Sequence, residues 1–359
     1  MKKILTQQDM KDLNLNSILR LIRREGPVTR RQIAAALDLS WGAVSGATAT
    51  LLQGGYVKEV AAPEVAGAGR TPTALVINQD DHFLLGLDVN RTGLSGVVTD
   101  QCGNVVHSLS AESTAADRDA QITEIRELID RLLELCGDRS VLAIGLAMQG
   151  AVDSANGISA SFPTTGWRDV PLAQILTEAY HIPTFLGHDP DCILYAASAE
   201  QALKDAILLR VDKGIGMAVM LDGKLFQRFG AFELGFTGSG TASLNDLITT
   251  EGLAHAAGVP FEQLVADAKA GNKAALALFD RLAEALGETM VNMMHIFHVD
   301  RFILCGKMLA HHALFRQRLT AVTEQRSPRR VLHTDITDVG KAAVGAALLA
   351  AARHEIKFE

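Results

Sequence analysis

The first 60 residues alternate hydrophobic stripes with signals that stop and start helices. A first helix is predicted from apolar residues that recur on one face, which are Leu15, Ile18, Leu19 and Ile22. Gly26-Pro27 ends this helix, and Thr29 and Ser40 are good N-cap residues for two further short helices. Residues 56–60 then alternate like a strand. The order helix, helix, tight turn, helix, strand predicts a winged helix-turn-helix, whose third helix lies in the DNA major groove.

The outward face of the predicted third helix is small and polar. Such a face lets a helix approach DNA closely and offers hydroxyl groups to phosphates and base edges. Arg30 and Arg31 begin the second helix, where we expect them to meet phosphates. The DNA contacts predicted on the third helix and its cap are Ser40, Trp41, Ala43, Ser45, Gly46 and Thr48. From the pattern alone, the alternative is a three-helix bundle used for packing or dimerisation.

Residues 61–72 (AAPEVAGAGRTP) are rich in Gly, Ala and Pro, a composition typical of a linker. Arg70 follows small residues in this segment, where a basic arm could enter a minor groove. A solvated linker arginine is the alternative interpretation of the same residue.

After the linker, strand and helix patterns alternate, which predicts a mixed α/β body with two lobes. The predicted strands cover 82–100 (two strands), 141–148, 184–187, 206–210, 217–221 and 301–304, with Asp222-Gly223 as a hairpin turn. The predicted helices cover 115–136, 171–180 and 193–203, and the last third of the chain is mostly helical.

Length and charge also indicate a division of the chain into a head and a body. At 359 residues the chain has room for two or three domains, each with its own core. Its net charge of −7 argues against a uniformly basic nucleic-acid coat. Residues 1–75, however, carry ten Lys and Arg against six Asp and Glu, and the remainder carries 24 against 35. A head of charge +4 therefore precedes a body of charge −11.

Membrane-spanning and disulfide-rich classes are not expected. The longest apolar run, Ala342–Ala352, is shorter than the ~18 residues that a membrane span needs. The N-terminus lacks the apolar core of a signal peptide. The four cysteines, Cys102, Cys136, Cys192 and Cys305, are scattered and form no close pair. We therefore expect an intracellular protein of the reducing cytoplasm.

Short motifs in a fixed order resemble those of a known family. In the head they are Arg20–Ser40 (RLIRREGPVTRRQIAAALDLS) and Gly67–Pro72 (GAGRTP). Along the body they are Gly145–Asp153 with Gly157, Gly166–Leu172, Gly187–Asp189 with Ala199-Glu200, Asp222–Leu225, Phe232–Gly235 and Gly345–Ala347. Together they resemble the ROK family of repressors and sugar kinases, in its xylose- and N-acetylglucosamine-repressor-like branch. The resemblance covers nearly the whole chain.

The resemblance implies an α/β fold in which an N-terminal winged helix-turn-helix precedes a two-lobed actin-like ATPase body. It implies a DNA-binding domain over residues 1–60 and a wing and linker over 61–80. The first lobe would consist of 81–187 and 340–359. The second lobe, which would carry ligand binding and dimerisation, would consist of 188–339.

Two phosphate-binding motifs of the family's kinases are altered in this chain. The kinases carry D-x-G-G-T in the first hairpin, where glycine lets the backbone wrap the phosphates of ATP. This chain has Asp88-Val89-Asn90-Arg91-Thr92 instead. The second phosphate loop reads Leu304-Cys305-Gly306-Lys307, in which Lys307 would attract phosphate only as a point charge. We therefore expect neither ATP binding nor enzyme activity.

The family's zinc site is also altered. Its pattern places one histidine and three cysteines around a tetrahedral metal. Here Phe236 stands at the position of the histidine, and residues 237–245 contain no cysteine. His295 and His298 share a helix but have no third ligand that the sequence identifies. We expect no structural zinc and no other cofactor.

The resemblance assigns ligand binding to Gly150, His188, Asp189, Glu233 and Asn245. In the family, the aspartate matching Asp189 contacts a sugar hydroxyl and is the general base of the kinases, so it would be catalytic here only in a kinase. Its alternative role is that of a helix N-cap before Pro190. With Phe236 in place of histidine and Asn245 in place of a glutamate, the pocket implies an unusual sugar, a sugar derivative, or no effector.

These observations favour a cytoplasmic DNA-binding regulator, which we expect to be a repressor of carbohydrate-related genes. A homodimer or dimer of dimers would read a pseudo-palindromic operator with half-sites ~10 bp or a multiple apart. A sugar or sugar derivative in the inter-lobe cleft would favour one arrangement of the heads. The alternatives are a sugar kinase with an accessory DNA-binding head and a ligand-independent regulator whose body is a dimer scaffold.

Overall fold

The computed structural model describes residues 6–62, 73–91, 93–163, 165–227, 234–239, 242–327 and 330–357. The chain divides into two compact units. The first comprises Met1–Leu146, Pro171–Leu186 and Ala346–Glu359, and the second comprises Ala147–Val170 and Gly187–Gly345. The predicted head and first lobe therefore share one unit, whereas residues 147–170, predicted in the first lobe, belong to the second unit.

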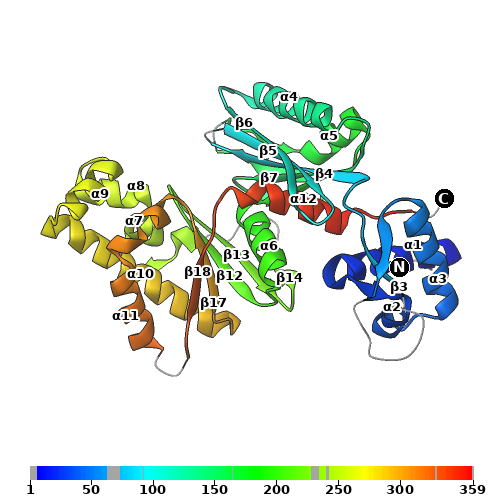
Figure 1. The fold of residues 1–359 in the computed structure, drawn as a ribbon. Coiled ribbons are helices and arrows are strands. Elements are labelled where there is room, and N and C mark those ends of the chain that lie inside the picture. Colours follow the sequence, from blue (N-terminus) through cyan, green and yellow to red (C-terminus); the bar gives the residue numbers. More distant parts are fainter. Residues whose placement is uncertain are drawn as a thin grey trace. The chain divides into compact units, whose positions relative to one another are not determined.

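Three helices and a three-stranded sheet form the head of the first unit (Figure 1). Thr29 and Ser40 accept hydrogen bonds from backbone N–H groups three residues later and so start the second and third helices, as predicted. The apolar stripe of the first helix lies in the head's core. The helices are α1 (Gln7–Glu25), α2 (Arg30–Leu37) and α3 (Trp41–Gln53), and the strands, in the order β1-β3-β2, are β1 (Val28–Thr29), β2 (Val57–Ala61) and β3 (Thr73–Ile77). The fold is a winged helix-turn-helix.

The composition of residues 61–72 predicted a linker, and the resemblance predicted a wing and linker over 61–80. β2 and β3, on either side of residues 62–72, pair antiparallel, from Val57 opposite Ile77 to Ala61 opposite Thr73. Leu75 of β3 is fully buried in the head's core, so β3 belongs to the head. Arg70 and the rest of Gly67–Pro72 lie outside the described residues.

A five-stranded sheet, in the order β11-β7-β4-β5-β6, forms the centre of the rest of the first unit. α4 (Arg118–Cys136) packs on one face and the end of α12 (Lys341–Arg353) on the other (Figure 1). Gly145 allows α12 to approach closely, because a Cβ there would lie 2.0 Å from the Ala346 carbonyl oxygen. The strands are β4 (His82–Asn90), β5 (Gly93–Asp100), β6 (Val105–Glu112), β7 (Ser140–Met148) and β11 (Thr184–His188), and α5 (Leu172–Tyr180) precedes β11.

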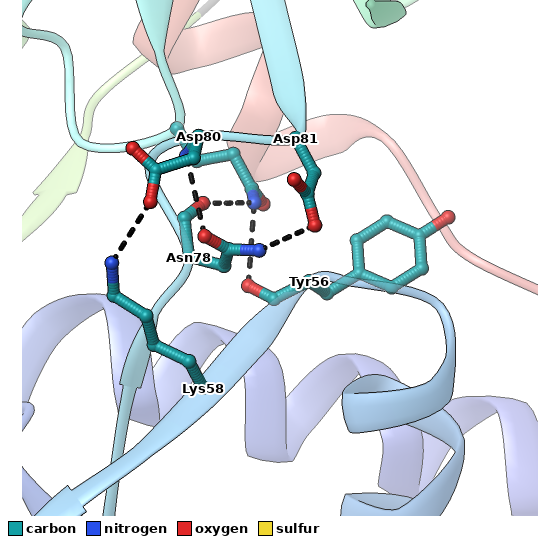
Figure 2. A network of polar contacts seen from close by, with 6 residues as sticks. Tyr56, Lys58, Asn78, Asp80 and Asp81 are labelled. Carbon is teal, nitrogen blue, oxygen red and sulfur yellow. Dashed lines mark hydrogen bonds and ion pairs between the residues drawn. The ribbon is translucent and has the colours of Figure 1, made fainter.

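A polar network fastens the head to this sheet, and Figure 2 shows its members around Asn78. Gln101, which is fully buried, donates from Nε2 to the carbonyl oxygens of Tyr56 (3.3 Å) and Asn78 (3.0 Å). The Asn78 N–H also donates to the Tyr56 oxygen, at 3.0 Å. Lys58 pairs with Asp80 at 3.0 Å. The turn after α3 is therefore bonded directly to the strands that follow the wing.

The C-terminal segment makes a second attachment. Asn16 of α1 exchanges two hydrogen bonds with the backbone of Ile356, at 2.7 and 2.8 Å. The Ile356 side chain is buried in the core of the head, beside residues more than 300 positions earlier in the chain. Arg23 donates to the Ala351 carbonyl oxygen at 3.1 Å. The head is thus completed by residues from the other end of the chain.

The second unit has a five-stranded sheet of its own, in the order β14-β13-β12-β17-β18, with β12, β17 and β18 parallel. Its core is formed by this sheet and the helices around Phe279 and Leu286. The sheet strands are β12 (Ala206–Val211), β13 (Ile215–Leu221), β14 (Lys224–Leu225), β17 (Arg301–Cys305) and β18 (His333–Ile336). The short strands are β8 (Val152–Asp153), β9 (Ile158–Ser161), β10 (Arg168–Val170), β15 (Gly238–Ser239) and β16 (Ala242–Ser243). The helices are α6 (Asp189–Gln201), η1 (Leu234–Phe236), α7 (Leu244–Ile248), α8 (Thr250–Ala257), α9 (Phe261–Lys269), α10 (Lys273–Phe297), η2 (Lys307–Leu314) and α11 (Arg316–Arg326).

Candidate DNA-binding surface and ligand pocket

The exposed face of α3 is a smooth strip with one large side chain at its start. Trp41 is 62% exposed, although tryptophan is usually among the more buried residue types. One and two turns further on, Ser45 and Ala49 are exposed on the same face. Gly42 and Gly46 are exposed beside them. The strip therefore offers an aromatic ring, a hydroxyl and bare backbone to whatever lies against it.

The two glycines of this strip are not required by the fold. A Cβ at Gly42 or Gly46 would meet no atom within 4 Å, and neither residue has a positive φ. Glycines in other helices do have a packing reason: a Cβ at Gly252 would lie 2.2 Å from the Asn245 carbonyl oxygen, and one at Gly287 would lie 2.9 Å from Val322. Glycine in a helix interior costs about 0.5–1 kcal/mol relative to alanine. Gly42 and Gly46 thus lower the stability of α3 relative to alanine, and no packing contact within this chain requires glycine there.

The predicted DNA contact at Thr48 is wrong, and the predicted contact at Arg30 has partners within the head. Thr48 is fully buried, so it faces the head's core and not the outside. Its hydroxyl accepts from Arg30 Nε at 3.0 Å, and Arg30 also pairs with Glu59 of β2 at 2.8 Å. Arg30 therefore joins α2 to α3 and the wing; its side chain is 23% exposed, and its contact with phosphate stays a prediction. Threonine is usually exposed, so the sequence did not report the burial of Thr48 beneath the Arg30 side chain.

The remaining predicted DNA contacts differ in how exposed their side chains are. Arg31 is exposed at the start of α2, and Ser45 and Gly46 are exposed on α3. Ser40 is exposed, but its hydroxyl accepts the Ala43 N–H as the cap of α3, and Ala43 itself is half-buried. Their contact with DNA stays a prediction.

The candidate ligand pocket of the second unit centres on a buried aspartate. Asp189 is the first residue of α6, and its carboxylate makes no capping hydrogen bond, because His188 occupies the N-cap position. The predicted N-cap role of Asp189 is therefore wrong. Its side chain is only 5% exposed, and Oδ2 accepts from the guanidinium of Arg210. His188 Nε2 lies 3.4 Å from Oδ1. Both carboxylate oxygens thus face cationic or potentially cationic nitrogen donors.

Further charged groups surround this pair. Arg210 Nη2 also lies 3.7 Å from Asp212 Oδ2, and Gln227 Nε2 donates to Asp191 Oδ2 at 3.1 Å. Burial raises the pKa of the Cys305 thiol to about 12, with Arg210 lowering it and Asp189 raising it, so Cys305 is a neutral neighbour of the cluster. Arg210 was not among the residues predicted for this pocket. The signal was a charged residue inside an otherwise apolar strand, Ala206–Val211.

Gly150 and Asn245, two further predicted ligand residues, lie in the second unit, and among the described residues neither makes a hydrogen bond to Asp189. Gly150 has φ of +88°, and a Cβ there would lie 2.3 Å from the Ser161 carbonyl oxygen, so it is required by a tight turn. Asn245 of α7 is half-buried, and its Oδ1 has no hydrogen-bond partner among the described residues. Glu233 lies outside the described residues.

In the hairpin that resembles the kinases' first phosphate loop, two side chains of β4 bond to each other. Asp88 is buried near the end of β4, and Asn90 donates from Nδ2 to Asp88 Oδ2 at 3.1 Å. Asn90 pairs with Gly93 across the turn. An amide therefore stands where the family's kinases have a glycine.

Two negative findings apply to the described part of the chain. It holds no group of three or more His, Cys, Asp or Glu side chains placed to bind a metal ion. Phe236, at the position of the family's zinc-binding histidine, is 76% exposed. Among the described helices, none is long and apolar enough to cross a membrane.

Comparison with known proteins gives two matching families. The profile described as ROK family matches residues 84–238 and 239–353, which is most of the chain. The profile described as winged helix-turn-helix DNA-binding matches residues 11–58.

Several relatives carry names. The chain is similar to the xylose repressor of Caldicellulosiruptor bescii, with 23% identity over 89% of both chains. It is 26% identical to the xylose repressor of Bacillus spizizenii over 64% of this chain, but it spans only 60% of that protein's length. The DNA-binding transcriptional dual regulator NagC of Escherichia coli is 27% identical over 60% of this chain and 54% of its own.

Solved structures show the fold. A ROK family transcriptional regulator described as a homologue of the E. coli MLC protein superposes with a TM-score of 0.82 at 16% identity, covering 96% of this chain and 97% of its own. The ROK hexokinase of Thermus thermophilus superposes with a TM-score of 0.67 at 22% identity, covering 75% of this chain and 97% of its own. The regulator's likeness thus extends over the head as well as the body.

Proposed function

The chain belongs to the ROK family, and we propose that it is a DNA-binding transcriptional regulator, a repressor, of carbohydrate-related genes. The observation that carries the proposal is the exposed strip of α3 on a winged helix-turn-helix, with two glycines that the fold does not require. Relatives named as xylose repressor and as NagC support the same function.

On DNA, we place α3 in the major groove with its bare strip against the base edges. Trp41 supplies an apolar contact, the Ser45 hydroxyl a hydrogen bond, and Arg31 a phosphate contact. The α3 strip offers no arginine, and its only amide, Gln53, lies at the far end, so few bidentate base contacts are available. Specificity then depends on close apposition of the helix and on the shape of the duplex.

The second unit is the proposed effector site, with Asp189 and His188 as hydrogen-bonding groups for a sugar or sugar derivative. Asn245 offers a further half-buried acceptor, and we keep Gly150 and Glu233 as expected members of the site. An effector would act only through its different affinities for the DNA-binding and released states. We further propose a cytoplasmic homodimer without zinc or ATP, in which two heads read a pseudo-palindromic operator.

A sugar kinase is the second candidate function, favoured by the likeness of the body to ROK kinases. The first hairpin argues against it, because Asn90, bonded to Asp88 at 3.1 Å, stands where the family's kinases have a glycine for the ATP phosphates. ATP consumption across a sugar panel, lost in Asp189→Asn, would restore the kinase candidate.

The deciding experiment is operator binding. Fluorescence anisotropy with the protein's own upstream region and with random duplex, at several salt concentrations, measures both specificity and the electrostatic contribution. We expect Arg31→Ala to lower the slope of log K against log salt by about 0.9 per subunit. Arg131→Ala, on the exposed surface of α4, is the matched control and should change nothing. Equal affinity for both duplexes would refute the proposed function.

A further inference from the structure

Arg210 lies between two carboxylates that belong to different elements. It projects from the end of β12 and donates to Asp189 Oδ2 at the start of α6, while Asp212, two residues along, lies 3.7 Å from Nη2. The guanidinium side chain is 12% exposed, the Asp189 side chain 5% and the Asp212 side chain 23%. The same cation therefore has a close partner and a more distant one.

This geometry gives the Arg210 guanidinium two alternative ion-pair partners, Asp189 and Asp212. A buried guanidinium without a carboxylate is strongly disfavoured, so it leaves Asp189 only if another anion receives it. Asp212 is that anion, because it needs only a small movement of the guanidinium. An arginine fork can satisfy either carboxylate through parallel N–H groups. The Asp189 carboxylate can thus be released without leaving the buried Arg210 guanidinium unpaired.

We propose that Arg210 is a built-in competitor for the effector: it covers Asp189 in the resting state and moves to Asp212 when a neutral polyhydroxyl ligand takes its place. The inference rests on the proposed function and adds the regulation of the same site. A sugar hydroxyl would donate to the released Asp189 carboxylate. Asp189 and Asp212 outnumber Arg210 here, so a neutral sugar is favoured over a sugar phosphate or sugar acid.

The competitor sets the sensitivity of the site. When only a fraction of the protein has a free binding group, the apparent dissociation constant equals the intrinsic constant divided by that fraction. If Asp189 is released in about 1–10% of molecules, removing Arg210 tightens binding roughly 10- to 100-fold. Arg210 would then raise the sugar concentration at which the regulator responds.

The test measures sugar binding by calorimetry and by thermal shift, with D-xylose, D-glucose and N-acetyl-D-glucosamine as probes. The variant is Arg210→Met, which keeps the length of the side chain but removes its charge. Arg301→Met is the matched control, because Arg301 is also paired with an aspartate in this sheet, Asp335 of β18 at 2.8 Å, and does not contact Asp189. Operator binding of every variant is measured alongside.

We expect Arg210→Met to bind at least one probe 10-fold or more tightly than the unchanged protein, and Arg301→Met to bind as before. The double variant Arg210→Met with Asp189→Asn should lose the gain. Equal affinity in the unchanged protein and Arg210→Met, or no binding of any probe to either, overturns the inference. In those cases, intact operator binding would still support the proposed function, whereas failure to bind the operator would refute the proposed function as well.

A second variant covers the case in which Arg210→Met does not fold. Asp212→Asn removes the alternative partner and confines Arg210 to Asp189, so it should weaken sugar binding at least threefold. Its side chain is more exposed than that of Asp189, so the change is better tolerated. Unchanged or tighter binding in Asp212→Asn overturns the inference independently.

Discussion

Gly46→Ala separates the needs of the fold from those of DNA binding, because it should change the two in opposite directions. Gly46 is an exposed residue inside α3, and a Cβ there meets no atom within 4 Å. Alanine in an exposed helix interior is favoured over glycine by about 0.5–1 kcal/mol. For a unit of this size, that corresponds to a rise in melting temperature of roughly 1–4 °C.

The same methyl group should weaken operator binding. If the backbone of α3 lies against the duplex, the added carbon fills space that the base edges occupy. Forcing a methyl group into a close-packed contact costs about 1–3 kcal/mol, which is roughly a 5- to 150-fold loss of affinity. Fluorescence anisotropy with the operator, together with thermal melting of the same preparation, measures both effects. Gly42→Ala should behave in the same way.

The control is a stabilising change on a helix far along the chain from the head. Thr123→Ala, on the exposed face of α4, raises helix propensity and should leave operator affinity unchanged. A Gly46→Ala variant that is more stable and binds the operator as tightly as before would refute the reasoning, since the strip would then not lie against DNA.

Three further predictions concern titratable groups and metal. Burial and the nearby charge of Arg23 lower the pKa of His354, so the unfolded chain binds more protons than the folded chain. The free energy of unfolding of the first unit should therefore be highest above about pH 6.5 and fall on acidification. In His354→Gln, the midpoint of urea unfolding should depend less on pH. An equal fall in the variant would exclude His354 as the source. At pH 8 Cys102 should react fastest with a thiol reagent, because it is exposed whereas Cys136, Cys192 and Cys305 are buried. Burial raises the pKa of Cys102 as well, but it raises that of Cys136 to about 11 and that of Cys305 to about 12; a second thiol labelled as fast as Cys102 would contradict this. Elemental analysis should find less than ~0.1 zinc per chain, and a chelator should not change the melting temperature; stoichiometric zinc would contradict the prediction.

The head could be predicted from sequence because its signals are local. Thr29 and Ser40 cap their helices whatever surrounds them, and the spacing of Leu15, Ile18 and Ile22 reports one buried face. The strands of both lobes followed from apolar runs that end at turns. In each case a few neighbouring residues contain all the information.

The errors arose where the outcome depends on a partner distant in the sequence. Composition does not report the pairing of β2 with β3 on either side of residues 62–72, which depends on the burial of Leu75 in the head's core. Thr48 is polar, and only its hydrogen bond from Arg30 explains its burial. The pairing of Arg210 with Asp189 joins residues 21 positions apart, and no periodic pattern reports such a contact.

The burial of Ile356 in the head's core has a consequence for the modular evolution of this protein. Exchanging the first 77 residues for those of another regulator would surround the Ile356 side chain with a core that it does not match, and would remove Asn16, the partner of the Ile356 backbone. A successful chimaera must therefore take both ends of the chain from the same parent. Heads and bodies of this kind would be inherited as matched pairs, and substitutions in α1 should be coupled to substitutions in the last few residues.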